Sequence, residues 1–151
     1  MCIEVLNLGN NSLQELPEGL GSSLNNLRSS SSAGISSRLF LVCLSEDVGQ
    51  LKGLKKLCIS HNKIQYLPSQ IGALQFLEEL DISFNDLRDL PRSFSNLKRL
   101  RTLDADHNKL NQFPPEILAL GDLEELDCTG NKFEALQEIY EAAVHQNLLA
   151  Q

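Results

Sequence analysis

The feature that most constrains the fold of this chain is a pattern that restarts every 23 residues, at Leu54, Leu77, Leu100 and Leu123. Each unit fits the template LxxLxLxxNxLxxLPxxLxxLxx. A fixed period of roughly 20–50 residues is typical of repeat architectures, in which each unit forms one coil and packs only on its neighbours. Such a stack offers an extended surface rather than an enclosed pocket, so the pattern favours binding over catalysis.

The unit at residues 77–99 shows what each position is expected to do. Leu80 and Ile82 alternate with polar residues, which predicts a short strand, and successive strands are expected to form one parallel sheet. Pro91 follows at the turn onto the other side, where its fixed φ and missing N–H suit a segment outside the sheet. The prediction is an α/β solenoid with a parallel β-sheet on the concave face and short helical or extended segments on the convex face.

One asparagine recurs in each unit at the point where the chain leaves the strand. A buried turn leaves backbone N–H and C=O groups that need partners, and an amide side chain has both donors and acceptors. We therefore predict a structural role for these residues, as an internal ladder that joins the coils. The ladder would consist of Asn11, Asn62, Asn85, Asn108 and Asn131.

The repeats predict one domain over residues 1–136. Its coils are expected to start near residues 3, 27, 54, 77, 100 and 123. The coil near residue 27 is degenerate, because the Ser-rich break at residues 28–43 lacks the leucine pattern. Three explanations remain open: a degenerate repeat with an extruded loop, a functional insertion, or an artefact of sequence assembly or splicing. Residues 137–151 are expected to form a tail or a short capping helix.

Composition limits the classes of partner. The net charge of −7 and the pI of about 4.9 disfavour nucleic acids and anionic membranes, which attract basic surfaces. No apolar run approaches the roughly 20 residues of a membrane span, and the start of the chain lacks the features of a signal peptide. The cysteines have no metal-ligand spacing and are expected to be reduced thiols of a cytoplasmic protein. They are Cys2, Cys43, Cys58 and Cys128.

The residue between the two apolar strand positions is expected to point outward from the concave face. In three adjacent coils this residue is an aspartate, which gives an acidic stripe with Lys56 near its upstream end. Two interpretations are open: a solvated charged face, or a docking strip for a basic segment of a partner protein. The candidate partner-binding residues are Cys58, Ser60, His61, Glu79, Asp81, Ser83, Phe84, Thr102, Asp104, Asp106, His107, Glu125, Asp127 and Thr129.

Phe84 shares a further column with His61 and His107, and it is expected either to anchor an interface or to close the end of a strand. The two histidines are two coils apart, roughly 10 Å, which is too far to share a metal ion. Carboxylates in a row on a sheet lack the surrounding oxygen ligands that Ca²⁺ needs. Neither a nucleophile–base arrangement nor a GxxxxGK loop is present, so we expect no catalytic residues, metal or cofactor.

The repeats, with LP at the turn onto the convex side, resemble the Ras-group class of intracellular leucine-rich repeats. The segments IEVLNLGNNSLQELPEGLGSSL and LEELDISFNDLRDLPRSFSNLKRLRTLDADHNKLNQFP are similar to the repeat region of vertebrate Roco-type proteins, which lies ahead of a Ras-like GTPase module. The resemblance implies a cytoplasmic signalling protein whose repeats bind other proteins. Two alternatives remain: a regulatory fragment of a GTPase whose GTP-binding part is missing, or a truncated or misassembled product without independent function.

Overall fold

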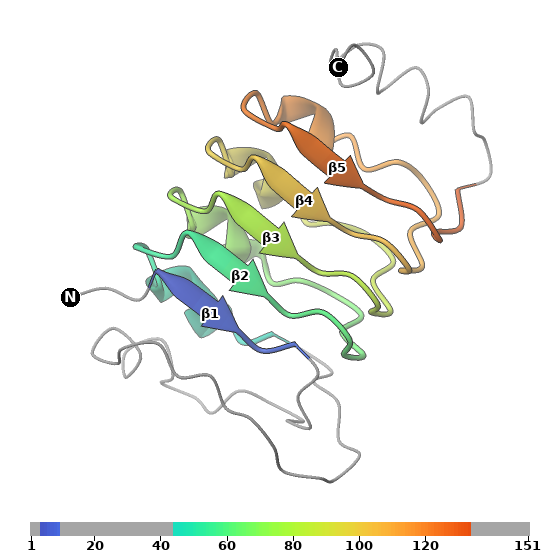
Figure 1. Ribbon diagram of the computed structural model, residues 1–151, viewed down its shortest axis with the longest axis horizontal. Coiled ribbons are helices and arrows are strands. Elements are labelled where there is room, and N and C mark those ends of the chain that lie inside the picture. Colours follow the sequence, from blue (N-terminus) through green and yellow to red (C-terminus); the bar gives the residue numbers. More distant parts are fainter. Residues whose placement is uncertain (1–3, 10–43, 134–151) are drawn as a thin grey trace, which may run out of the picture.

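The computed structural model describes residues 4–9 and 44–133 (Figure 1). Five short strands lie side by side in one parallel sheet, in the order in which they occur in the chain. The strands are β1 (Val5–Asn7), β2 (Lys56–Cys58), β3 (Glu79–Asp81), β4 (Thr102–Asp104) and β5 (Glu125–Asp127). Together with the short helical turns described next, this sheet confirms the predicted α/β solenoid.

On the other side of the coils that contain β1 to β4, the chain forms a short 3₁₀ helix (Figure 1). The helices are η1 (Glu46–Gln50), η2 (Ser69–Ala73), η3 (Arg92–Asn96) and η4 (Ile117–Ala119). Pro68 and Pro91 precede η2 and η3 with φ of −67° and −68°, so proline sets the direction of the chain as it enters each helix. One apolar side chain from each helix points inward and is buried, for example Ile71 in η2 and Phe94 in η3.

Neighbouring strands pair in a register that matches the sequence period. Leu80 of β3 is the partner of Leu57 in β2 and of Leu103 in β4, each 23 residues away. These three leucines are almost completely buried between the sheet and the helices. Because one coil is one sequence period, each column of the repeat becomes a row of side chains that crosses the sheet.

The first coil departs from this rule. Leu6 of β1 pairs directly with Leu57 of β2, although 51 residues separate them in the chain. Backbone bonds from Leu8 N to Cys58 O (2.6 Å) and from Lys56 N to Glu4 O (2.9 Å) extend the pairing beyond the strands. The sheet therefore has no place between β1 and β2 for a strand from the degenerate coil expected near residue 27.

The convex half of this first coil comes from a later part of the chain. Helix η1 packs against η2 as β1 packs against β2, and it buries Val48. The strand and the helix of the first coil are thus separated by residues 10–43, which lie outside the described residues. Asn11, the Ser-rich break and the C-terminal segment 137–151 lie outside them as well.

The recurring asparagines connect the coils. In Asn85, Nδ2 donates to the carbonyl oxygens of Ile82 (3.1 Å) and Ser83 (3.0 Å) in its own coil and to that of Ile59 (3.0 Å) in the preceding coil. Its Oδ1 accepts a hydrogen bond from Ile64 N (3.0 Å). The Nδ2 atoms of the other described ladder residues donate in the same pattern; these residues are Asn62, Asn108 and Asn131.

Candidate functional site

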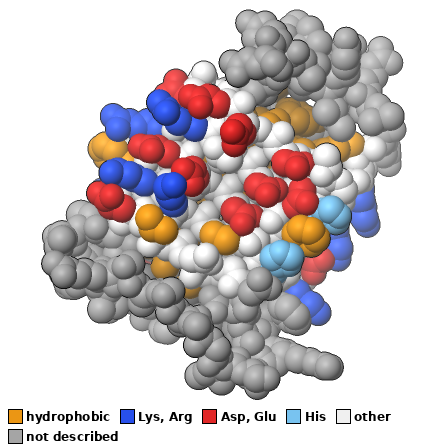
Figure 2. All heavy atoms as spheres, viewed as in Figure 1, with side chains coloured by type: hydrophobic (Ala, Val, Ile, Leu, Met, Phe, Trp, Pro, Cys, Tyr) orange, Lys and Arg blue, Asp and Glu red, His pale blue; other side chains and the backbone are white. Residues whose placement is uncertain are grey.

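The face of the sheet opposite the 3₁₀ helices, which we call the open face, carries the candidate binding residues. Figure 2 views this face. Acidic side chains gather over the C-terminal ends of the middle strands, whereas basic and acidic side chains are mixed over the N-terminal ends. The open face therefore has an acidic half at the C-terminal ends of the strands and a half of mixed charge at their N-terminal ends.

Charges in the row nearest the N-terminal ends of the strands are largely paired. Lys56 Nζ lies 2.6 Å from Glu79 Oε1, and Thr102 Oγ1 donates to Glu125 Oε2 over 3.4 Å. Beside this row, Lys55 pairs with Glu4 at 3.2 Å. Since Lys56 and Lys55 each pair with a glutamate, part of the negative charge at this end of the sheet is already compensated.

The next row is the acidic row, which we define as Asp81, Asp104 and Asp127. In each of these residues Oδ1 accepts a hydrogen bond from the backbone N–H two residues further on, with lengths of 3.0, 3.1 and 2.9 Å. Asn7 makes the same contact with Gly9 N at 2.9 Å. This is the local turn that Asp and Asn side chains favour. The acidic row thus has a structural role at the end of each strand, in addition to its charge.

Asp81 and Asp104 differ in their surroundings. Burial raises the pKa of Asp81, but hydrogen bonds from Ser83 and Cys58 to the carboxylate outweigh this effect, so the pKa lies below its usual value. The pKa of Asp104 lies above its usual value because burial raises it and the charges of Asp106, Asp81 and Asp127 add to the effect. The Asp104 carboxylate is therefore the less well compensated of the two.

The two described cysteines are free thiols with raised pKa values. Burial is the main cause for both. The pKa of Cys128 is raised to about 12. Cys58 Sγ donates to Asp81 Oδ2 over 3.1 Å. Because the thiolate is the nucleophilic form, neither residue is suited to covalent chemistry.

The third row requires a correction to the expected surface. Ser60 and Ser83 retain only 7% and 5% of their exposure, so they are not part of the accessible face. Their short side chains contact the residue two positions earlier in the same coil. Ser83 Oγ donates to Asp81 Oδ1 at 2.6 Å, and Ser60 Oγ lies 3.2 Å from Cys58 Sγ. Thr129, at the end of the row, is exposed.

Asp106, in the same row, is mostly buried. Its Oδ2 lies 2.6 Å from His107 Nδ1. Its Oδ1 is buried without a hydrogen-bond partner in the part of the chain that the structure describes. The carboxylate therefore connects the acidic row with the aromatic column that follows.

The rings of His61, Phe84 and His107 form a stack, which we call the aromatic column. Phe84 lies 4.4 Å from each imidazole, centroid to centroid, and the ring planes differ by only 10° and 8°. All three residues have positive φ (54°, 51° and 47°), as does Gly130 (66°) in the next coil. Phe84 remains 41% exposed. The sequence already indicated this stacking, because each of the three residues follows the previous one by one repeat period and so occupies the same position in the next coil.

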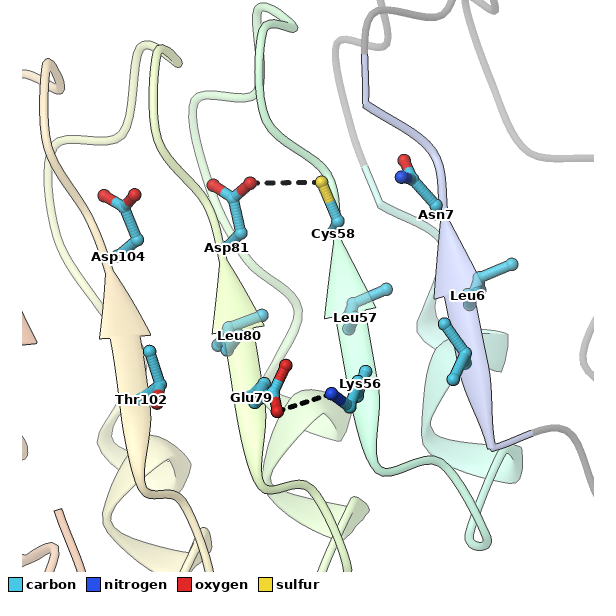
Figure 3. A pocket seen from close by; sticks show the side chains of 11 residues that line it. Leu6, Asn7, Lys56, Leu57, Cys58, Glu79, Leu80, Asp81, Thr102 and Asp104 are labelled. Carbon is cyan, nitrogen blue, oxygen red and sulfur yellow. Dashed lines mark hydrogen bonds and ion pairs between the residues drawn. The ribbon is translucent and has the colours of Figure 1, made fainter. Parts of the chain in front are cut away.

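A shallow groove of about 370 Å³ crosses β1 to β4 on the open face (Figure 3). Figure 3 shows the two interactions within it, Lys56–Glu79 and Cys58–Asp81, with the carboxylate of Asp104 beside them. The lining residues are Val5, Leu6, Asn7, Lys56, Leu57, Cys58, Glu79, Leu80, Asp81, Thr102 and Asp104. Val5 and Asn7 were not among the candidate partner-binding residues, although the repeat pattern places Asn7 in the same outward-facing column as Cys58 and Asp81.

The described residues were also compared with the requirements of a metal site and of a membrane-spanning helix. Among residues 4–9 and 44–133, no group of three or more His, Cys, Asp or Glu side chains is arranged to hold a metal ion. Within the same described part of the chain, no helix has the length and apolar character needed to cross a membrane.

Comparisons with known proteins agree with this architecture. A family model described as a leucine-rich repeat region matches residues 41–142, and a single leucine-rich repeat model matches residues 2–27. A leucine-rich repeat protein of Leptospira interrogans has a similar structure, with 34% identity over 85% of this chain and 31% of that chain and a TM-score of 0.65. No curated protein sequence matches the chain.

Two proteins of Arabidopsis thaliana are also similar. The leucine-rich repeat ectodomain of the receptor kinase SOBIR1 shares 34% identity over 64% of this chain and 56% of that chain, with a TM-score of 0.55. A chain of the BIR3–SERK2 complex shares 30% identity over 60% of this chain and 50% of that chain, with a TM-score of 0.54. This chain spans less than two thirds of the length of each of these proteins.

Proposed function

Because this chain belongs to the leucine-rich repeat family, we propose that it is a non-catalytic protein-interaction module that binds basic segments of partner proteins on its open face. One observation carries the proposal: among the described residues, no Lys or Arg side chain pairs with the acidic row. In the neighbouring row, by contrast, Lys56 is paired with Glu79. Charge complementarity of this kind favours encounter with a basic partner and excludes acidic ones.

The groove supports the same proposal by its shape. It is open and shallow and spans four strands, which suits an extended segment better than a small molecule. The exposed part of Phe84 lies in the same coil as Asp81, three positions beyond the end of β3, and offers an apolar contact beside the charges. Residues that can contact the partner are Cys58, His61, Glu79, Asp81, Phe84, Thr102, Asp104, Asp106, His107, Glu125, Asp127 and Thr129.

The experiment is a titration of the isotope-labelled full chain with oligo-lysine and oligo-arginine peptides, followed by NMR. Amide shifts confined to β2–β5, and affinity that falls roughly tenfold between about 0.05 and about 0.5 M salt, are the expected results. The matched variant replaces all three aspartates of the acidic row with asparagine, which keeps the Oδ1 acceptor of each turn and removes only charge. Binding that persists unchanged in this variant would refute the proposal.

We further propose a cytoplasmic signalling context of the Roco type. The support is the resemblance of the LP-containing repeats, together with free thiols at Cys58 and Cys128, which suit a reducing compartment. Two measurements test it. The transcript should continue into a frame encoding a GxxxxGK loop, and a fluorescent fusion of the full-length product should be found in the cytoplasm. A product that is secreted, or that lacks this loop, would exclude the context without affecting the binding proposal.

A further inference from the structure

The carboxylates of the acidic row are not equivalent. Both oxygens of Asp81 have partners: Oδ1 accepts from Ser83 N and Ser83 Oγ, and Oδ2 accepts from Cys58 Sγ. In Asp104 and Asp127 only Oδ1 is engaged, by a backbone N–H. Within the described residues, no hydrogen bond or ion pair reaches Oδ2 of either one. The row therefore contains one satisfied carboxylate and two adjacent carboxylates with an oxygen available.

We propose that the open face recognises an arginine of its partner, and that the guanidinium group bridges Asp104 and Asp127 rather than binding at Asp81. The inference rests on the proposed function, since it names the side chain that the acidic row selects. Asp104 lines the groove and lies at its β4 end, so an extended segment in the groove can deliver a side chain to this pair.

The spacing of Asp104 and Asp127 suits the planar guanidinium group of arginine. Asp104 and Asp127 are directly paired residues of adjacent parallel strands, roughly 4.8 Å apart. Their Oδ1 contacts with the backbone hold both carboxylates in the same orientation. A guanidinium presents five N–H donors in one plane and can donate to two carboxylates at once, whereas a lysine ammonium acts as a point charge.

The electrostatics of the site favour the same side chain. Burial raises the pKa of Asp104, and the charges of Asp106, Asp81 and Asp127 raise it further. A cation placed between Asp104 and Asp127 offsets this repulsion. Arginine is preferred over lysine because its charge is more weakly hydrated and less costly to remove from water. At Asp81 the same cation would have to displace hydrogen bonds that already exist.

The test compares hexa-arginine and hexa-lysine, which carry equal charge, by calorimetric titration of the full chain. Three variants are used, each of which removes one negative charge: Asp104→Asn, Asp81→Asn and Asp122→Asn. The first two keep the Oδ1 acceptor, and Asp122, which is exposed outside the strands, controls for net charge. Circular dichroism confirms that each variant is folded before binding is measured.

The wild-type chain is expected to bind hexa-arginine more tightly than hexa-lysine. Asp104→Asn should weaken hexa-arginine binding about tenfold and remove the preference, because a charge-assisted hydrogen-bond pair is lost. Asp122→Asn should change it by no more than about twofold, and Asp81→Asn should weaken both peptides alike and keep the preference for hexa-arginine. Equal affinity of the wild-type chain for both peptides, or a preference that is lost equally in Asp81→Asn and Asp104→Asn, would overturn the inference and leave the proposed function standing. If neither peptide binds at all, the proposed function fails, and the inference with it.

Discussion

Replacing Asn85 with alanine removes a buried residue of the asparagine ladder. The side chain is 6% exposed and makes four hydrogen bonds. Nδ2 donates to the carbonyl oxygens of Ile59, Ile82 and Ser83, and Oδ1 accepts from Ile64 N. Alanine leaves these backbone groups in the turn without their partner.

The magnitude follows from the groups left unpaired. A buried donor without a partner costs about 1–3 kcal/mol, and here the Ile64 N–H loses its acceptor. The Nδ2 group has only two protons to share among the three carbonyl oxygens, so it makes the equivalent of two full hydrogen bonds. The loss of these two bonds costs about 1 kcal/mol each. We therefore expect Asn85→Ala to lower the free energy of unfolding by about 3–5 kcal/mol, a large part of the roughly 5–15 kcal/mol of an ordinary domain.

The assay is urea unfolding at pH 7, monitored by circular dichroism, with Asn131→Ala as the comparison. Asn131 makes the same set of contacts in the last described coil but is partly exposed, so water can replace its bonds. We expect Asn131→Ala to cost about 1–2 kcal/mol. A loss below about 1.5 kcal/mol in Asn85→Ala, or equal losses in the two variants, would contradict the view that burial sets the value of each ladder residue.

Gly72→Ala should destabilise the fold by more than about 1 kcal/mol in the same assay, because a Cβ would meet the backbone at the start of η3, whereas Gly121→Ala, with open space around it, should be neutral. Asp81→Asn should lower the free energy of unfolding at pH 7 and match the wild type in strong acid, because a lowered pKa stabilises the folded state only while the carboxylate is ionised. Asp104→Asn should be neutral or stabilising at pH 7, with the difference disappearing as the pH falls below about 4, because a raised pKa has the opposite sign. Cys128 should react with iodoacetamide at pH 8 roughly a thousandfold more slowly than a free thiol, as measured by mass spectrometry on the folded chain.

The repeat period made most of the fold predictable from the sequence. Since one period is one coil, the sequence alone assigns the columns containing Asp81 and Phe84 to rows that cross the sheet. The junction of β1 with β2 could not be predicted in this way. It depends on which distant segments complete a coil, and residues 28–43 contain no leucine pattern that would indicate the partner.

The properties of individual site residues were less accessible to the sequence. An outward-facing position in or just beyond a strand predicts exposure, but Ser60 and Ser83 are buried. Their short hydroxyl side chains contact the larger side chains of Cys58 and Asp81, which lie beside them. Asp81 and Asp104 occupy the same repeat position and still have pKa values shifted in opposite directions. The difference depends on which thiol and hydroxyl groups lie within hydrogen-bond distance.

The aromatic column is a place where stability alone does not account for the residues present. A residue other than glycine at positive φ costs on the order of 1–3 kcal/mol, and this cost applies to His61, Phe84 and His107. The two ring contacts return about 0.5–1.5 kcal/mol each. The three strained residues together cost about 3–9 kcal/mol, which exceeds the about 1–3 kcal/mol that the two ring contacts return. Gly130 shows that the same turn forms without an aromatic ring. An exposed Phe84 without a net benefit to folding is consistent with its proposed role as an apolar contact for a partner.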